Sequence, residues 1–248
     1  KATSSNEGIV EVSATNKAVT GSYSIKVTAL ASNARLNSTE AVSFDSSKTN
    51  LQEQLGLTSA DPIVFKVNGS EEISIDPGTD TIDTLVSKIN NAGAGVTAFF
   101  DKTLNRMFIS SNSTGAAAKI DFDDVSNAGE LFNNLKLDGN PDTGITDPFA
   151  AVNGTDAVFE LNGTLLNQAT NKFTRAGVTY TLTGTSASET VSVNITSDTD
   201  AIYESIKTFV DLYNTVIDKI NSKLTEERDT DYLPLTDEER EKLTDEQE

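Results

Sequence analysis

The stretch from residue 200 to residue 224 constrains the fold of this chain more than any other. Its apolar residues recur every three or four positions, which places them on one face of a helix, close to the seam of a coiled coil. The main row comprises Ile202, Ile206, Phe209, Tyr213, Val216, Ile220 and Leu224, and a second row beside it comprises Val210 and Ile217. Asp198 or Thr199 can cap the start of this helix. No earlier segment predicts a comparable helix, so the apolar face indicates either self-association or a missing partner segment.

The composition indicates β structure for the rest of the chain and excludes several kinds of active site. The 248 residues are rich in Thr, Ser, Asn and Val and contain no Trp. Cysteine and histidine are both absent, which excludes disulfides, thiol nucleophiles, Cys–His zinc sites and catalysis through imidazole. The net charge of −19 repels phosphate backbones and anionic membranes, so we expect no nucleic-acid partner. No apolar run approaches the roughly 20 residues that span a bilayer, so we expect no membrane insertion.

The first predicted strands are residues 9–14 and 23–30, in which apolar and polar side chains alternate. Thr20-Gly21-Ser22 separates them, so we expect two strands around a turn. Residues 31–62 are rich in Ser, Asn, Thr and Ala and predict a connection, with one helical turn that ends at Gly56.

The clearest block of the sequence is residues 63–122. Residues 64–67 and 73–75 flank Asn68-Gly69, a strong hairpin signal because both turn residues tolerate positive φ. A helix is predicted from Thr81 to Asn91, with Thr79 or Asp80 as its cap. Its apolar stripe comprises Ile82, Leu85, Val86 and Ile89. Two further strands, at residues 96–100 and 106–110, complete a compact α+β unit.

A second β region follows a less regular stretch. Residues 131–137 predict a short helix, and residues 138–144 predict a loop. The apolar pattern and Asn-Gly pair of residues 64–70 then recur at residues 157–164, which indicates a second hairpin of the same type. Further strands are predicted at residues 178–182 and 191–195.

No group of side chains predicts a catalytic residue, a metal site or a cofactor. Asp121, Asp123 and Asp124 lack the spacing of a calcium-binding loop and are interpreted as solvated carboxylates at a strand end. Gly93-Ala94-Gly95 follows a helix instead of opening one, so we do not interpret it as a phosphate-binding loop.

Four groups of motifs occur in order along the chain. They are GSYSIKVTALA at residues 21–31; FKVNG, TLVSKIN and GVTA at residues 65–69, 84–90 and 95–98; DAVFELNG and GVTYTL at residues 156–163 and 177–182; and FVDLYN at residues 209–214. In this order they resemble the flagellar filament capping proteins, also called the flagellar hook-associated protein 2 family. The positions that carry the resemblance are Tyr23, Asn68, Gly69, Leu85, Ile89, Asn90, Asn162, Gly163, Tyr213 and Asn214.

The resemblance implies an α+β, mostly β fold with two β-rich head domains, one inserted in the other, followed by a long C-terminal helix. Residues 1–42 and 150–197 would form the first head domain, and residues 43–149 the inserted one. Residues 198–248 would be part of a helical leg domain, and its other helices would precede Lys1 and follow Glu248.

The resemblance also implies a function. Members of this family form a ring, often a pentamer, at the distal end of the bacterial flagellar filament, where they promote flagellin insertion and filament elongation. We therefore expect a non-enzymatic, extracellular protein without cofactors, secreted by the flagellar export apparatus. Its expected partners are further copies of itself, flagellin, an export chaperone and, if it contributes to adhesion, host surface receptors. A chain without cysteine suits a protein that is secreted unfolded and assembles outside the cell.

Two other functions remain open at this point. A surface adhesin or glycan-binding β module would bind its receptor as an isolated head, whereas a cap needs its legs to restore filament growth. A carboxylate-based hydrolase would need an acidic pair in one cleft and would lose turnover when that pair is mutated. Because much of the expected leg is missing, we expect this chain alone to be monomeric or weakly associated.

Overall fold

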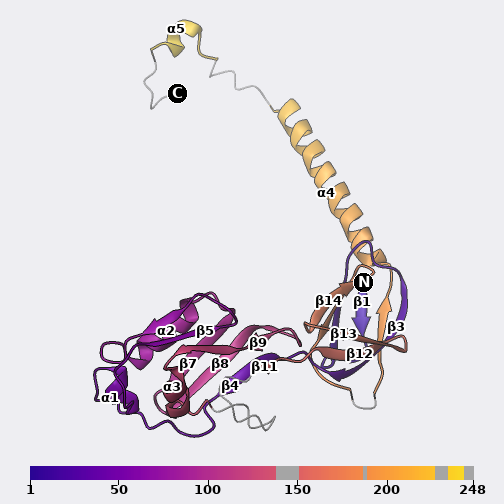
Figure 1. Ribbon diagram of the computed structural model, residues 1–248. Coiled ribbons are helices and arrows are strands. Elements are labelled where there is room, and N and C mark those ends of the chain that lie inside the picture. The colour runs from indigo at the N-terminus through magenta and orange to yellow at the C-terminus, as the bar shows by residue number, and fades with distance from the viewer. Residues whose placement is uncertain (138–150, 187–188, 227–233, 243–248) are drawn as a thin grey trace. The chain divides into compact units, whose positions relative to one another are not determined.

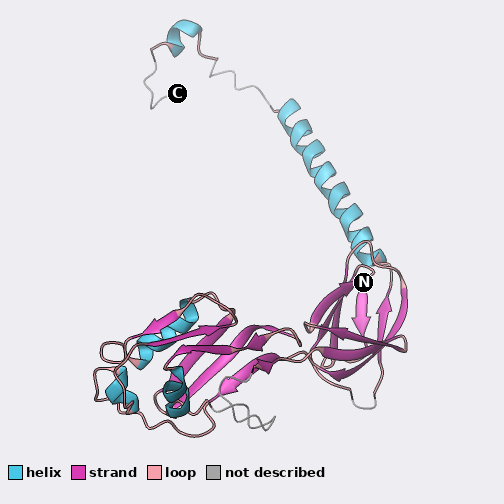
Figure 2. Ribbon diagram, viewed as in Figure 1, coloured by secondary structure: helices cyan, strands magenta, loops and turns pink. Residues whose placement is uncertain are grey.

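The computed structural model describes residues 1–137, 151–186, 189–226 and 234–242. The loop expected at residues 138–144 lies outside these described residues. The chain forms two compact units, Lys1–Thr196 and Ser197–Glu248 (Figures 1 and 2). The first unit is rich in strands and the second is helical, which confirms the predicted α+β, mostly β class.

The first unit contains a β part built from both ends of its sequence. Its larger sheet has, in spatial order, β1 (Ala2–Ser4), β16 (Val191–Ile195), β3 (Gly21–Ala29), β12 (Ala157–Leu161) and β13 (Thr164–Gln168). Its smaller sheet has β14 (Lys172–Arg175), β15 (Val178–Leu182) and β2 (Val10–Ala14). All neighbouring strands are antiparallel. Alternate side chains of both sheets meet in one hydrophobic cluster, where the ring of Phe173 stacks between those of Phe159 and Tyr180, with centroids 4.7 and 5.3 Å away.

β2 and β3 lie where the alternation of apolar and polar residues predicted strands, but they do not pair with each other. β2 pairs with β15, whereas β3 lies between β12 and β16 in the other sheet. Residues 9–30 therefore form the two strands without a hairpin between them.

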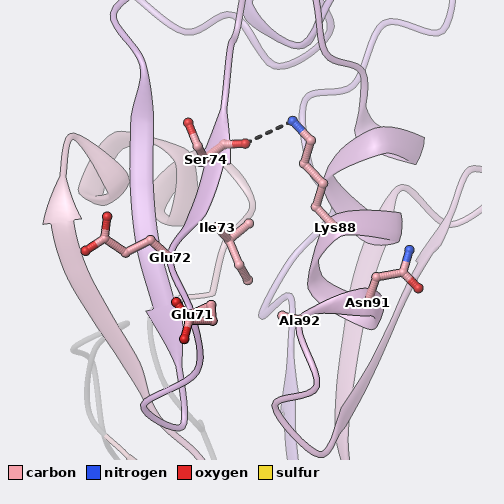
Figure 3. Close-up of a pocket in the computed structure, with 7 residues that line it drawn as sticks. All are labelled: Glu71, Glu72, Ile73, Ser74, Lys88, Asn91 and Ala92. Carbon is pink, nitrogen blue, oxygen red and sulfur yellow. Dashed lines mark hydrogen bonds between the residues drawn. The ribbon is translucent and has the colours of Figure 1, made fainter.

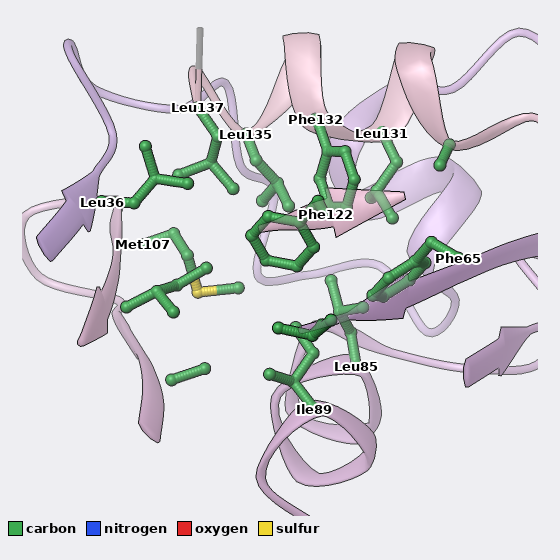
Figure 4. Packing of buried hydrophobic residues seen from close by; sticks show 14 of the residues in the cluster. Leu36, Phe65, Leu85, Ile89, Met107, Phe122, Leu131, Phe132, Leu135 and Leu137 are labelled. Atoms are coloured by element: carbon green, nitrogen blue, oxygen red, sulfur yellow. The ribbon is translucent and has the colours of Figure 1, made fainter. Parts of the chain in front are cut away.

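The second hydrophobic cluster of this unit is the larger of the two and draws on residues 34–152. One sheet contains β4 (Asn33–Asn37), β8 (Arg106–Thr114) and β7 (Val96–Asp101), and another contains β10 (Phe122–Ser126), β5 (Ile63–Val67) and β6 (Ile73–Ile75). β9 (Lys119–Ile120) pairs with β11 (Val152–Asn153), and the helices are α1 (Leu51–Leu55), α2 (Ile82–Asn91) and α3 (Ala128–Asn134). The rings of Phe65, Phe122 and Phe132 contact one another in the middle of this cluster (Figure 4).

The turn and the helix predicted between residues 63 and 122 are confirmed, with small corrections to the helix cap and to the preceding connection. Asn68 and Gly69 both have positive φ, and β5 pairs with β6 across them. The cap of α2 is Thr81, whose hydroxyl accepts from the Thr84 amide, so the expected caps Thr79 and Asp80 were wrong by one or two residues. The expected connection 31–62 contains the helical turn before Gly56, but it also contains β4.

The chain passes between the two clusters through a tight junction of small residues. Ser32 and Thr155 form an isolated β-bridge, and their hydroxyls are 2.8 Å apart. A Cβ on Gly154 would overlap the carbonyl oxygen of Ser32, and a Cβ on Gly115 would lie 2.7 Å from the Cβ of Ala169. Glycine is therefore required at both positions, because the backbones approach too closely for a side chain.

The second unit is a single long helix followed by a short one. α4 spans Thr199–Leu224, and the carboxylate of Asp198 caps it by accepting from the Ala201 amide at 3.1 Å. This confirms one of the two predicted caps. α5 (Asp237–Arg240) lies further along the chain. None of the helices in the described parts of the chain is long and apolar enough to cross a membrane.

Candidate interaction surface

The apolar face of α4 is the main candidate for an interaction surface. Every side chain of the two predicted rows is exposed, including 69% of Phe209 and 78% of Leu224, and no residue of α4 is buried. Two more exposed apolar residues, Tyr203 and Leu212, flank these rows and were not part of the sequence prediction. Both could have been found from the sequence, because Tyr203 lies three residues before Ile206 and Leu212 lies three residues after Phe209 and four before Val216.

The exposed face needs a partner on energetic grounds. Burying one large apolar side chain contributes about 1.5–3 kcal/mol, so covering both rows would contribute on the order of 10 kcal/mol. Helices in proteins gain most of their stability from packing an apolar face of this kind, so an uncovered face leaves α4 without its main source of stability. Tyr213 lies in the main row and Asn214 is also exposed, so this part of the resemblance motif belongs to the same open helix.

The motif residues of the first unit play a different part, since they hold turns and strands together. Asn68 sits in the turn between β5 and β6, and its amide donates to the carbonyl oxygens of Ala94 and Lys119, both at 2.9 Å. Its side-chain oxygen accepts from the Asp121 amide at 3.0 Å. One side chain thus ties the hairpin to two other segments, while Gly69 supplies the second positive φ of the turn.

Asn90 closes a sheet edge in a similar way. Its side-chain oxygen accepts from the Ala98 amide at 2.6 Å, and its side-chain nitrogen donates to the Ala98 carbonyl at 3.0 Å. This pair of bonds mimics a neighbouring strand on the free side of β7. Leu85 and Ile89, the other motif residues of α2, are buried in the core on the same helix.

The remaining motif residues lie in the other β part. The side chain of Asn162 accepts from the Ser24 amide at 2.9 Å, and Asn162-Gly163 forms a second turn with two positive φ values. The hydroxyl of Tyr23 donates to the Val19 carbonyl at 3.1 Å. Within the first unit, these motif residues therefore stabilise the fold.

A hollow of about 330 Å³ lies between β6 and α2. Glu71, Glu72 and Lys88 contribute its charged groups, and Figure 3 shows Lys88 reaching toward Ser74. The Lys88 ammonium donates to the Ser74 carbonyl at 2.9 Å and to the Asp80 carboxylate at 2.7 Å. The lysine is thus already engaged in holding α2 against the strand, and we assign no chemistry to this hollow.

The three aspartates at the end of β9 and in β10 are accounted for by local contacts. Asp121 pairs with Lys119 at 2.8 Å and raises the pKa of that lysine, and Asp124 accepts from the Ala128 amide at the start of α3. Asp123 is exposed. Among the residues that the structure describes, no group of three or more acidic side chains is arranged to hold a metal ion.

Replacing Asn90 by alanine tests the role assigned to this side chain. We expect a loss of about 1–3 kcal/mol in the free energy of unfolding, because two polar groups of Ala98 lose their partner. The matched control is Asn91→Ala on the same helix, because Asn91 is exposed like Asn90 but its side chain bonds, among the described residues, only to the Ser87 hydroxyl. Urea denaturation followed by circular dichroism measures both, and equal losses would contradict the assignment.

Comparison with known proteins agrees with this arrangement. Three family models match the chain: the flagellar hook-associated protein 2 N-terminus at residues 1–34, the flagellin hook IN motif at residues 62–113, and the flagellar hook-associated protein 2 C-terminus at residues 154–248. A flagellar hook-associated protein 2 from Halalkalibacterium halodurans is 30% identical over 94% of this chain, and one from Thermotoga maritima is 36% identical over 87%. The chain spans 50% of the first relative's length and 33% of the second's.

Solved structures show the same fold. The flagellar cap protein FliD from Escherichia coli aligns with 89% of this chain and 73% of its own, with a TM-score of 0.66 and 23% identity. FliD from Pseudomonas aeruginosa aligns with 89% of this chain and 99% of its own, with a TM-score of 0.61 and 21% identity.

Proposed function

Since this chain belongs to the flagellar hook-associated protein 2 family, we propose that it is part of a structural cap at the distal end of the bacterial flagellar filament. The observation that carries this proposal is the order of the matches. Both family ends flank the hook motif, as the sequence resemblance implied, and together they include most of the chain.

In this proposal the apolar face of α4 is the packing surface of the leg. We propose that Ile202, Ile206, Phe209, Val210, Tyr213, Val216, Ile217, Ile220 and Leu224 pack against other leg segments of the same protein. Two observations support this: the face is exposed along the whole helix, and the relatives are two to three times as long as this chain.

The two hydrophobic clusters support the proposed division of the head. The first head domain would take both flanks of the sequence, and the inserted domain would take the cluster formed from residues 34–152. This range is wider than the expected 43–149 because β4 and β11 contribute to the inserted core. The glycine-lined junction would join the two domains.

In this proposal the protein acts through its shape and its contacts, not through a chemical reaction. Copies of the protein would form a ring, with a pentamer as the expected number, and would guide flagellin subunits into the growing filament without making or breaking a bond. The protein would leave the cell through the flagellar export apparatus, with an export chaperone, and act at the tip of the filament. Adhesion to host surface receptors would be a second role. The net charge of −19 argues against nucleic acid as a partner.

Complementation tests the proposed function. The full-length protein that contains this chain is added to a strain that lacks its filament cap, and filament length and flagellin lost to the medium are measured. We expect long filaments and little free flagellin. Short or absent filaments, with flagellin still lost to the medium, would contradict the proposal.

A further inference from the structure

One edge of the five-stranded sheet is open to pairing with another strand. An edge strand presents unpaired N–H and C=O groups to any other chain, and proteins commonly blunt such edges with charges, bulges, short strands or covering segments. β13 forms one edge of this sheet.

In the part of the chain that the structure describes, the edges of the two three-stranded sheets around the larger hydrophobic cluster are protected. β6 has only three residues, and its Ser74 carbonyl accepts a hydrogen bond from the Lys88 ammonium, while Asn90 covers β7. The pairing of β10 with β5 is interrupted by a register shift after Asp124, and β10 also carries two acidic side chains. β4 carries Arg35 and lies beside β11.

The other edges of the smaller cluster are protected as well. β1 has three residues and lies against β2, which carries Glu11. β14 begins with Lys172 and ends with Arg175. Within the described residues, β13 alone is a regular edge strand of five residues without a charge, a glycine, a proline or a bulge.

The hairpin geometry shows which groups of β13 are free. The two-residue turn places Leu161 opposite Thr164, and this pair exchanges hydrogen bonds, as does every second pair beyond it. The backbone groups of Leu165 and Asn167 therefore point away from β12. Neither residue has a backbone hydrogen bond to another described residue, and 63% of the Leu165 side chain is exposed.

We propose that β13 pairs antiparallel with β13 of a second copy of this chain. With the two-fold axis at Leu166, the free groups of Leu165 would face those of Asn167 of the partner subunit, so each strand supplies donors and acceptors at the required spacing. A second copy is the favoured occupant because the strand is uncharged. Self-pairing here brings no like charges together, although the chains as a whole repel each other through a net charge of −19.

The pairing would join the two five-stranded sheets into one continuous sheet. A contact of this length is small for a stable interface, so we expect a weak dimer that forms at high concentration. The proposal is separate from the capping function. Two-fold pairing is isologous, whereas a ring needs two different surfaces on each copy, so either can fail without the other.

Amide hydrogen exchange measured by NMR on the whole 248-residue chain tests the pairing at the level of single residues. On raising the concentration from about 0.05 to about 1 mM, we expect the amides of Leu165 and Asn167 to exchange at least about fivefold more slowly. The Leu166 amide, already bonded to β12, should change little. This pattern distinguishes strand pairing from association through the apolar face of α4.

Two variants and a matched control complete the test. Leu165→Lys places a charge from each copy on the same face, and Asn167→Pro removes an outward donor without touching the ladder to β12, so both should abolish the concentration-dependent protection. Leu104→Lys makes the same substitution at an exposed leucine in the turn between β7 and β8 and should retain it. The proposal is overturned if Leu165 and Asn167 exchange equally fast at all concentrations, if protection survives in Leu165→Lys, or if it appears only when flagellin is added.

Discussion

Replacing Phe209 by aspartate in the full-length protein should abolish the restoration of filament growth in a cap-deficient strain. Phe209 lies in the middle of the main apolar row of α4 and is one of its most exposed members in this chain. In a packed leg the aspartate would lose about 3 kcal/mol of apolar burial and would also bury a charge without a partner, which costs several kcal/mol more. The expected result is filament growth at the level of the cap-deficient strain, with flagellin accumulating in the medium.

The control for this variant is Thr208→Asp, one residue away on the same helix. Thr208 lies outside the apolar rows, and its hydroxyl bonds only to the Glu204 carbonyl of the preceding turn. We expect near-normal filament growth from it. The 248-residue chain provides a second check, because Phe209→Asp should leave its thermal unfolding nearly unchanged while the residue is exposed. Equal filament growth with both variants would show that the apolar face of α4 is not a packing surface.

Replacing Phe65 by alanine should have the largest effect on stability. Phe65 is fully buried, and its ring lies 5.2 Å from that of Phe132 and 5.9 Å from that of Phe122. Removing a buried phenylalanine costs about 3–5 kcal/mol, out of a total of about 5–15 kcal/mol for a typical domain. We expect a fall in the midpoint of thermal unfolding of roughly 6–20 °C, measured by far-ultraviolet circular dichroism.

Phe99→Ala is the matched control for this core variant. Phe99 lies in β7, in the other three-stranded sheet of this part, but is 57% exposed, and its ring contacts Phe108 with centroids 6.5 Å apart. Its replacement should cost about 1 kcal/mol or less. Because no tyrosine lies between residues 34 and 152, the near-ultraviolet signal of Tyr23 and Tyr180 reports separately on the smaller cluster. If Phe65→Ala and Phe99→Ala unfold at the same midpoint temperature, the prediction that packing of the Phe65 ring stabilises the larger cluster is contradicted.

Local features of the fold could be predicted from the sequence because each depends on a few adjacent residues. The two hairpin turns require positive φ at both central residues, and the Asn-Gly pairs at residues 68–69 and 162–163 adopt it. The helical spacing predicted α2 and α4 to within a residue or two at their ends. The face of α4 followed from the same spacing, and Tyr203 and Leu212, which lie three or four residues from members of the two rows, widen it at its margins.

Strand partners could not be predicted in this way. β2 and β3 are adjacent in sequence, yet each pairs with strands more than a hundred residues away, because burial of their apolar faces in two different sheets decides the pairing. β4 was missed because Asn-Ala-Arg-Leu-Asn has no β-branched or aromatic residue, so its strand structure comes from pairing with β8. The resemblance pointed to Asn90, but its partner Ala98 was visible only in three dimensions.

The close bridge between Ser32 and Thr155 also sets an order in which the two cores can form. β3 and β12 are neighbours in their sheet but are separated in the chain by the whole of the larger core. Pairing them in an otherwise unfolded chain would close a long loop, and the entropy lost on closure grows with loop length. Once the larger core has folded, residues 32 and 155 already lie side by side and the loop is effectively short. We infer that the larger core folds first and acts as the template on which the two halves of the smaller one meet.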